Sequence, residues 1–242
     1  MSDSLGAAAG GALKLWLQAT FQGARACWRR PLASFGGFAL LTGVIFGGCV
    51  LPWFNFLFLL VLLAPLFGGY PHLILALLDQ QPFRFPLFWA GFRQYERFLS
   101  LFWLTYLMTI FLCFPLLITL WLVRHTSLDG RLGVGLGIGI STLLWIGLMH
   151  RYLFVFFLAA ERPRETTVDE ILRTSEALIA PQRGRVIAVS FALLLFGAAG
   201  GLLFLLPVRG GGLMAGAVLG VTLPVAGCGL GWLYRSMSAA AE

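Results

Sequence analysis

Charged side chains are scarce in this sequence. Asp, Glu, Lys and Arg make up 11% of its 242 residues, whereas an ordinary soluble domain has about 25%. Lysine is almost missing, since Lys14 is the only one among 17 basic residues. A water-soluble globule is excluded on these grounds. A disordered chain is excluded because 59% of the residues are apolar, and disorder requires few of them. We therefore expect a protein whose solvent is mostly lipid.

Motifs for metal binding, redox chemistry and catalysis are missing as well. The four cysteines form no CxxC pair, so we interpret them as small apolar residues and not as zinc ligands or a disulfide framework. They are Cys27, Cys49, Cys113 and Cys228. The chain also has no HExxH, GxSxG or Walker motif, which are the common signatures of catalysis and nucleotide binding. The sequence predicts a protein that is not an enzyme and has no cofactor and no metal.

Long apolar runs are what the sequence has in abundance. A bilayer core about 30 Å thick needs roughly 20 apolar residues for each helix that crosses it. Six segments reach that length, at residues 32–51, 53–78, 98–123, 132–158, 186–207 and 212–234. The first run begins too far into the chain for a cleavable signal peptide, so we count it as a membrane helix. The prediction is an all-α, polytopic transmembrane bundle of six helices. It divides into a basic amphipathic segment at 1–31, a transmembrane domain at 32–235 and a short tail at 236–242.

The basic residues are distributed unevenly over the segments outside these spans. If both termini lie on one side, 14 of the 17 basic residues lie on that side, and Arg124, Arg131 and Arg209 lie on the other. Basic residues collect in loops that stay in the cytoplasm, so both termini are predicted to be cytoplasmic. The net charge of +7 then faces anionic headgroups of the lipid bilayer, and we do not expect nucleic acid as a partner.

Three segments on the predicted cytoplasmic side are amphipathic and are expected to lie on the membrane surface. Residues 12–30 place basic and amide side chains on one face of a helical wheel and apolar side chains on the other, which is typical of an interfacial anchor. A second such helix is predicted over 86–99 and a third over 167–179. Thr167 and Glu170 in the third have the spacing of a capping box.

The end of the second span resembles the end of the fourth. Residues 70–79 match 152–161 at a constant offset of 82. Each segment is followed by a proline, Pro82 or Pro163, then by an amphipathic helix and the next span. Both copies run towards the cytoplasm, which would make a parallel repeat. The residue identity is low, so duplication and chance similarity between two membrane hairpins are both open.

Glycines recur at helical spacing in two spans. Gly212, Gly216 and Gly220 form a glycine zipper, and Gly43 and Gly47 repeat the spacing in the first span. Small residues four apart let helix backbones approach closely in lipid. We predict that these five glycines are helix-packing residues. The contact is either within the chain or with another chain, in a homo-oligomer or with a membrane protein partner.

Three ionisable residues lie within or beside the spans, at His72, His150 and Arg151. Such residues are candidates for function because a charge in the membrane is costly. They are our candidate intramembrane polar site. Arg151 either reaches the cytoplasmic interface along its aliphatic stem or lies deeper and needs a partner, depending on where its span begins. A proton relay between His72 and His150 is the less favoured interpretation, because the spans contain no carboxylate nearby.

Several short motifs carry a resemblance to a known group. They are Trp28-Arg29-Arg30-Pro31, Phe67-Gly68-Gly69-Tyr70, Phe88-Trp89-Ala90-Gly91-Phe92 and Thr174-Ser175-Glu176-Ala177-Leu178. Their order resembles uncharacterised bacterial six-helix integral membrane proteins, in particular those similar to the membrane domain that accompanies some glycerophosphodiester phosphodiesterases. The resemblance implies the topology and a location in the bacterial inner membrane. It supplies no activity and no ligand residue, and this chain has no phosphodiesterase domain.

The sequence leaves three classes of function. The leading hypothesis is a non-enzymatic membrane protein with a scaffold, assembly or lipid-associated role. The alternative is a small-solute or lipid transporter, which predicts a water-accessible cavity near the midplane. The third is an intramembrane enzyme, which predicts that His72, His150 and Arg151 converge. A scaffold predicts a solid, glycine-packed bundle instead.

Overall fold

The computed structural model describes residues 2–50, 63–82, 85–87, 89–125, 133, 136–137, 139–141, 144, 152–163, 165–202 and 211–241. Every regular element within these ranges is a helix, which confirms the predicted all-α class. Among the residues described, no helix combines the length and the apolarity that crossing a membrane requires.

A helix lies in or overlaps each of the six predicted apolar spans. These helices are α2 (Gly37–Val50), α4 (Leu63–Leu78), α5 (Tyr95–His125), α7 (Val155–Glu161), α9 (Arg183–Leu202) and α10 (Gly211–Ala241). A π-helical turn, Leu32–Gly36, precedes α2. The last helix continues to Ala241, so residues 236–241 extend α10 and do not form the separate tail predicted at 236–242. The reason is local, because this stretch contains no glycine or proline to end the helix.

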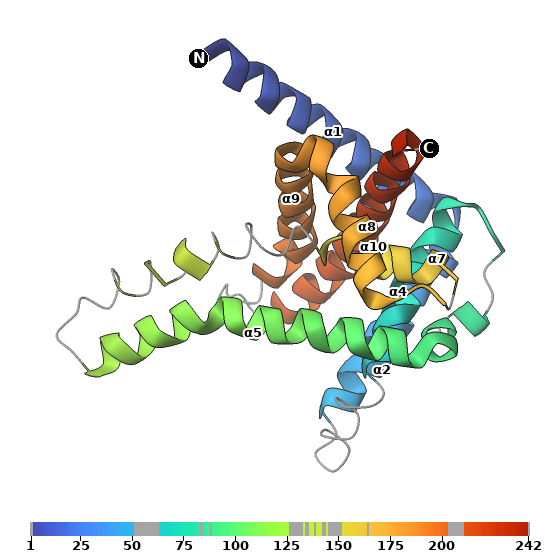
Figure 1. Ribbon diagram of the computed structural model, residues 1–242. Coiled ribbons are helices and arrows are strands. Elements are labelled where there is room, and N and C mark those ends of the chain that lie inside the picture. The colour runs from blue at the N-terminus through green and yellow to red at the C-terminus, as the bar shows by residue number, and fades with distance from the viewer. Residues whose placement is uncertain are drawn as a thin grey trace.

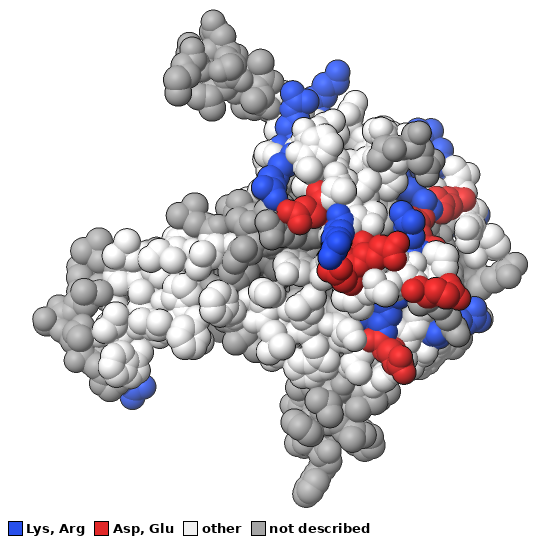
Figure 2. Space-filling view, in the orientation of Figure 1, with Lys and Arg blue, Asp and Glu red and all other residues white. Residues whose placement is uncertain are grey.

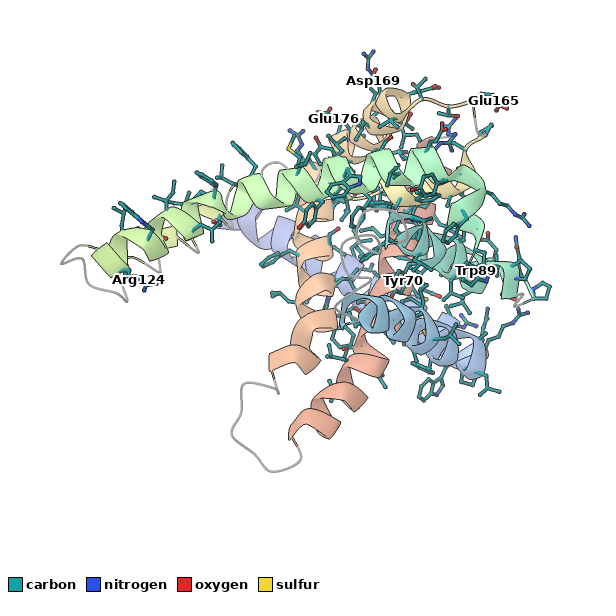
Figure 3. All side chains as sticks on the ribbon, turned by 90° about the horizontal axis from the view of Figure 1, so that it is seen from below. Tyr70, Trp89, Arg124, Glu165, Asp169 and Glu176 are labelled. Carbon is teal, nitrogen blue, oxygen red and sulfur yellow. The ribbon has the colours of Figure 1, made fainter. Side chains whose placement is uncertain are left out.

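The helices pack together at one end and diverge at the other. Figure 1 shows α9 and α10 side by side, with α1 (Ser2–Arg29) lying against them and α5 reaching away from the group. Seen from below, α5 runs across the direction of α9 and α10 (Figure 3). The largest fully buried side chains are Phe98, Phe154, Leu41, Leu73, Leu101 and Leu193. The described helices thus share a core near one end of the molecule.

Helix α1 has two apolar faces. Its small residues Ala19 and Cys27 are fully buried, and the helix packs on α10 and α9. Four of its large apolar residues face outward, and each is more than half exposed: Leu13, Leu17, Phe21 and Trp28. The segment predicted to lie on the membrane surface is therefore helical and amphipathic, but it also packs into the protein through its small residues.

Two of the four cysteines meet at the contact between α1 and α10. Cys27 and Cys228 are buried and free, and their sulfur atoms lie 3.7 Å apart. Both are part of the apolar core, as their lack of ligand spacing predicted. The side chains of Cys49 and Cys113 lie outside the described residues.

Glycine allows α1 and α10 to approach each other closely. A Cβ atom on Gly23 would lie 2.4 Å from the carbonyl oxygen of Val225 and 2.7 Å from the backbone nitrogen of Gly229. Real Cβ atoms do not approach backbone so closely. Gly231 is similar, because its Cβ would lie 2.4 Å from a methyl carbon of Ile74 on α4. These glycines make the close helix contacts of the described core.

The glycines predicted to pack helices are arranged differently. A Cβ on Gly43 or Gly220 would meet nothing within 4 Å, so neither residue makes a close helix contact. Both line a cavity of about 380 Å³ between α2 and α10, because these two helices diverge there. The surroundings of Gly47, Gly212 and Gly216 lie outside the described residues.

The prediction of a single amphipathic helix over 86–99 is wrong. The chain makes two short 3-10 helices there, η3 (Phe85–Leu87) and η4 (Ala90–Gln94), and α5 then begins at Tyr95. The close crossing of η4 over α4 explains this, since a Cβ on Gly91 would lie 2.1 Å from the carbonyl oxygen of Pro65. Tertiary contact has overridden the helical periodicity.

The third predicted amphipathic helix is confirmed as α8 (Val168–Ile179). The backbone N–H of Glu170 donates to the hydroxyl oxygen of Thr167 at 3.3 Å, which is the N-cap half of the predicted capping box. Ile171 and Ile179, which lie on the apolar face of α8, are buried. The short 3-10 helix η6 (Ala180–Gln182) then leads directly into α9.

The contact at Gly23 gives a direct test of the fold. We expect Gly23→Ala to destabilise the protein by about 1–3 kcal/mol, because the added methyl group overpacks a rigid backbone contact. Gly10→Ala is the matched control, since nothing lies within 4 Å of its Cβ position; alanine there should be neutral or stabilise by up to about 1 kcal/mol. Thermal denaturation in detergent micelles measures both. Equal stability of the two variants would contradict the contact between α1 and α10.

Candidate functional site

Helix α4 ends in a tight backbone motif. The N–H of Gln81 donates to the carbonyl of Ala76 at 2.9 Å, and the N–H of Gln80 donates to that of Leu77 at 3.4 Å. This is the hydrogen-bond pattern of a Schellman motif. Gln80 has the positive φ of 55° that the motif requires. The guanidinium of Arg30 donates to the carbonyl oxygens of Gln80, at 2.7 Å, and of Gln81, so this arginine holds the end of α4.

A second arginine holds the end of α7. Arg97, at the start of α5, is only 8% exposed. Its guanidinium donates to the carbonyl oxygens of Ala159, Arg162, Pro163 and Thr166 and to the side-chain oxygen of Gln94. Burial lowers the pKa of Arg97, and the Glu165 carboxylate opposes that shift, but an arginine stays protonated in proteins. Arg97 thus supplies donors to carbonyls that a helix end leaves without partners.

A third arginine connects α10 to both of these helix ends. One nitrogen of the Arg235 guanidinium lies 2.5 Å from a carboxylate oxygen of Asp79, and another lies 2.5 Å from one of Glu161. The hydroxyl of Tyr234 donates to the other oxygen of Glu161 at 2.5 Å. We call Arg30, Arg97 and Arg235, with the chain ends that they bind, the helix-end cluster. It fastens α4, α7 and α10 to one another.

The sequence match at an offset of 82 extends into this cluster. Asp79 and Glu161 differ by 82 positions and bind the same guanidinium. The carbonyls that follow them are also equivalent, because Arg30 binds those of residues 80 and 81 and Arg97 binds those of 162 and 163. The two segments therefore occupy corresponding places around Arg235. Their helix ends differ in detail, since only the end of α4 is a Schellman motif.

Charge gathers where these ends meet. Figure 2 shows basic and acidic residues over the packed end of the molecule, while the part of α5 that reaches away is uncharged up to one basic group at its tip. That group is Arg124, which Figure 3 places at the far end of α5, while Glu165, Asp169 and Glu176 lie on the other side of the molecule. Arg124, which the sequence predicts to lie opposite the termini, is therefore also separated in space from these acidic residues.

A cavity of about 710 Å³ lies beside the helix-end cluster, between the end of α4 and the 3-10 helices η3 and η4. Its polar lining residues are His72, Gln81, Arg93 and Gln94, and its apolar ones are Pro82, Pro86, Leu87 and Ala90. The Nε2 atom of His72 is buried and has no hydrogen-bond partner. No carboxylate is among the lining residues.

Only one of the three predicted polar site residues can be placed. His72 lies on α4, with its ring centroid 6.0 Å from that of Phe98. His150 and Arg151 lie outside the described residues, so their convergence with His72 stays a prediction. In the part of the chain that the structure describes, no group of three or more His, Cys, Asp and Glu residues could hold a metal ion.

The residues of the helix-end cluster were missed by the sequence analysis, which counted Arg30, Arg97 and Arg235 only as cytoplasmic charge. A signal for part of the cluster was present. The offset of 82 makes Asp79 and Glu161 equivalent, and two equivalent acids near the basic residue after the sixth span could have suggested a shared partner. Nothing in the sequence indicates that Arg97 binds carbonyls 62 to 69 positions away.

Substitution of Arg97 tests its role at the end of α7. We expect Arg97→Met to destabilise the protein by about 3 kcal/mol or more, because several buried carbonyls lose their donors at about 1–3 kcal/mol each. Arg97→Lys should recover little, since an ammonium group cannot reproduce the guanidinium fork. The control is Arg173→Met on α8, whose pair with Asp169 is largely exposed and contributes about 0–1 kcal/mol. Denaturation in mixed micelles checks the ranking, and comparable losses in the two Met variants would contradict it.

A double-mutant cycle tests whether Arg235 binds both Asp79 and Glu161. Both ion pairs are about one-third exposed, so we expect a coupling energy of about 0.2–1 kcal/mol between Arg235→Gln and Asp79→Asn. The same range is expected between Arg235→Gln and Glu161→Gln, and both values should fall at high salt, which screens such pairs. Stability of the single and double variants in micelles gives the two energies. A coupling that is zero for either acid would mean that Arg235 serves only the other.

Comparison with known proteins yields no match to a family model, to a curated protein or to a solved structure. The resemblance to bacterial six-helix membrane proteins therefore stays an expectation that rests on short sequence motifs. The function of this chain has to be argued from its own residues.

Proposed function

We propose that this chain is a polytopic protein of the bacterial inner membrane with both termini in the cytoplasm. We further propose that its role is non-enzymatic, as a scaffold, an assembly factor or a lipid-associated protein. The observation that carries the proposal is the separation of a charged, tightly bonded end from the exposed apolar side chains along α5. The short motifs shared with bacterial membrane proteins support the inner membrane as the location.

Helix α5 supplies the strongest support for a lipid environment. It has 31 residues, which is about 46 Å at 1.5 Å per residue. The printed sequence has no charged residue between Arg97 and Arg124. Seven large side chains between residues 106 and 121 are 46% to 64% exposed: Tyr106, Leu107, Phe111, Phe114, Leu117, Ile118 and Trp121. Water is a poor solvent for such a surface, and large apolar patches mark contacts with a membrane or a partner.

The helix-end cluster supports a structural role over a catalytic one. Its guanidinium groups are occupied by carbonyl and carboxylate oxygens. Such a network holds chain segments in register. The outward face of α1, with four large apolar residues, supports contact of this end with the bilayer interface.

Transport of a small solute or lipid is the second candidate. The cavity of about 380 Å³ between α2 and α10 favours it, because this cavity is lined mostly by apolar side chains and includes Pro224 inside α10. Proline in a membrane helix is a usual site of bending. Flux of a fluorescent lipid in proteoliposomes would distinguish a transporter from a scaffold, since a scaffold leaves the flux at the level of empty liposomes.

Reporter fusions test the proposed topology. We expect alkaline phosphatase to be inactive when fused after Glu242 and active when fused after Asp129, because the enzyme needs the oxidising periplasm for its disulfides. Green fluorescent protein should give the opposite pattern at the two sites. Sodium carbonate washing should leave the chain in the membrane pellet. Active phosphatase at Glu242, or release of the chain by carbonate, would contradict the proposal.

A further inference from the structure

The cavity beside the helix-end cluster is lined by groups that suit an anion. Arg93 lines it from η4. The side chain of Arg93 is exposed and forms no ion pair with a carboxylate among the described residues. Among the described residues that line the cavity, none has an acidic side chain to oppose a bound anion. A positive charge without a partner, in a concave site, is the usual basis for recognition of a phosphate group.

Neighbouring hydrogen bonds leave donors facing this cavity. The side-chain oxygen of Gln94 already accepts from Arg97 at 2.8 Å, so the NH₂ group of the same amide is the part left to donate. The main-chain carbonyl of Gln81 is likewise occupied by Arg30. The ring of His72 completes the polar lining with a buried Nε2 atom that has no hydrogen-bond partner. One oxygen of Gln94 and one of Gln81 thus already accept from an arginine, and the NH₂ group of Gln94 is left to donate.

The size and position of the cavity restrict the class of ligand further. Its volume of about 710 Å³ lies within the range of about 300–1,000 Å³ that is usual for small-molecule sites, and is ample for a phosphate ester of glycerol. Its apolar lining includes Pro82, Pro86 and Leu87. The neighbouring Trp89 is 47% exposed, and tryptophan is enriched at the level of lipid headgroups. A lining of both polar and apolar side chains suits a phosphate that carries an organic group.

We propose that this cavity is a binding site for a phosphate monoester or diester, with the phosphate oxygens held by Arg93, Gln81, Gln94 and His72. The ligand is either the headgroup of an anionic phospholipid or a soluble phosphate ester. The lipid form rests on the proposed membrane location, whereas the anion chemistry of the site does not.

Binding to the purified full-length protein tests the site and separates the two sources. In one arm, the protein in phosphatidylcholine nanodiscs is titrated with glycerol 3-phosphate and with inorganic phosphate by calorimetry. In the other arm, native mass spectrometry counts phosphatidylglycerol bound in competition with phosphatidylcholine. Each arm compares the unaltered chain with Arg93→Gln, and with Arg29→Gln as the control. Arg29 is an exposed arginine of α1 on the same predicted side, so the control removes the same charge.

We expect Arg93→Gln to weaken binding about tenfold or more in at least one arm, because it removes a charge-assisted contact. Arg29→Gln should change binding less than about twofold, since exposed charges on the same surface contribute little at physiological salt. Ala90→Leu should also weaken binding, because it fills the cavity without changing the charge. Its thermal stability shows whether the variant remains folded.

The outcomes decide separately whether the phosphate site exists and whether the proposed membrane role holds. Selective loss of phosphatidylglycerol supports a lipid headgroup, and loss of glycerol 3-phosphate or phosphate supports a soluble ester. If the reporter fusions fail but Arg93-dependent binding of the soluble ester remains, the proposed function is wrong and the site stands. Absence of binding in both arms, or equal effects of Arg93→Gln and Arg29→Gln, would overturn the site.

Discussion

Main-chain carbonyls at the ends of α4 and α7 have no helical donors, and the arrangement of the chain depends on the arginines that supply them. Arg97 comes from the start of α5 and Arg30 from the end of α1, so each helix end is held by a neighbouring segment. Arg235 on α10 then joins the two ends through Asp79 and Glu161. Because an arginine presents five donors in a fixed fork, three side chains connect five helices, α1, α4, α5, α7 and α10.

The same cluster explains where the polar and apolar surfaces lie. Its arginines and acids are gathered at the packed end (Figure 2), and the apolar length of α5 leads away from it. A proposed bilayer would cover the side chains that α5 exposes, and the proposed phosphate site lies beside the cluster. Gln94 and Gln81 link the two features, since each accepts from an arginine of the cluster and also lines the cavity.

The helices could be predicted from the sequence because apolar length and capping residues are local properties. Thr167 and Glu170 marked the start of α8, and long apolar runs marked the other helices. The 3-10 helices at 85–94 could not be predicted, because a backbone contact between Gly91 and Pro65 causes them. The same holds for Arg97, whose acceptors lie 62 to 69 residues away. Helical spacing also did not single out Gly23, whose close contact joins helices far apart in the sequence.

Accessibility of spin labels along α5 tests the central claim, that one end of the chain is polar and the apolar length of α5 lies in lipid. Labels are placed singly at Ser100, Leu107, Phe111, Leu117 and Arg124 in protein reconstituted in bilayers. The account predicts that collisions with oxygen rise and collisions with a water-soluble nickel complex fall from Ser100 to Phe111, with the reverse trend towards Arg124. Uniformly high collision with the nickel complex at all five positions would contradict it.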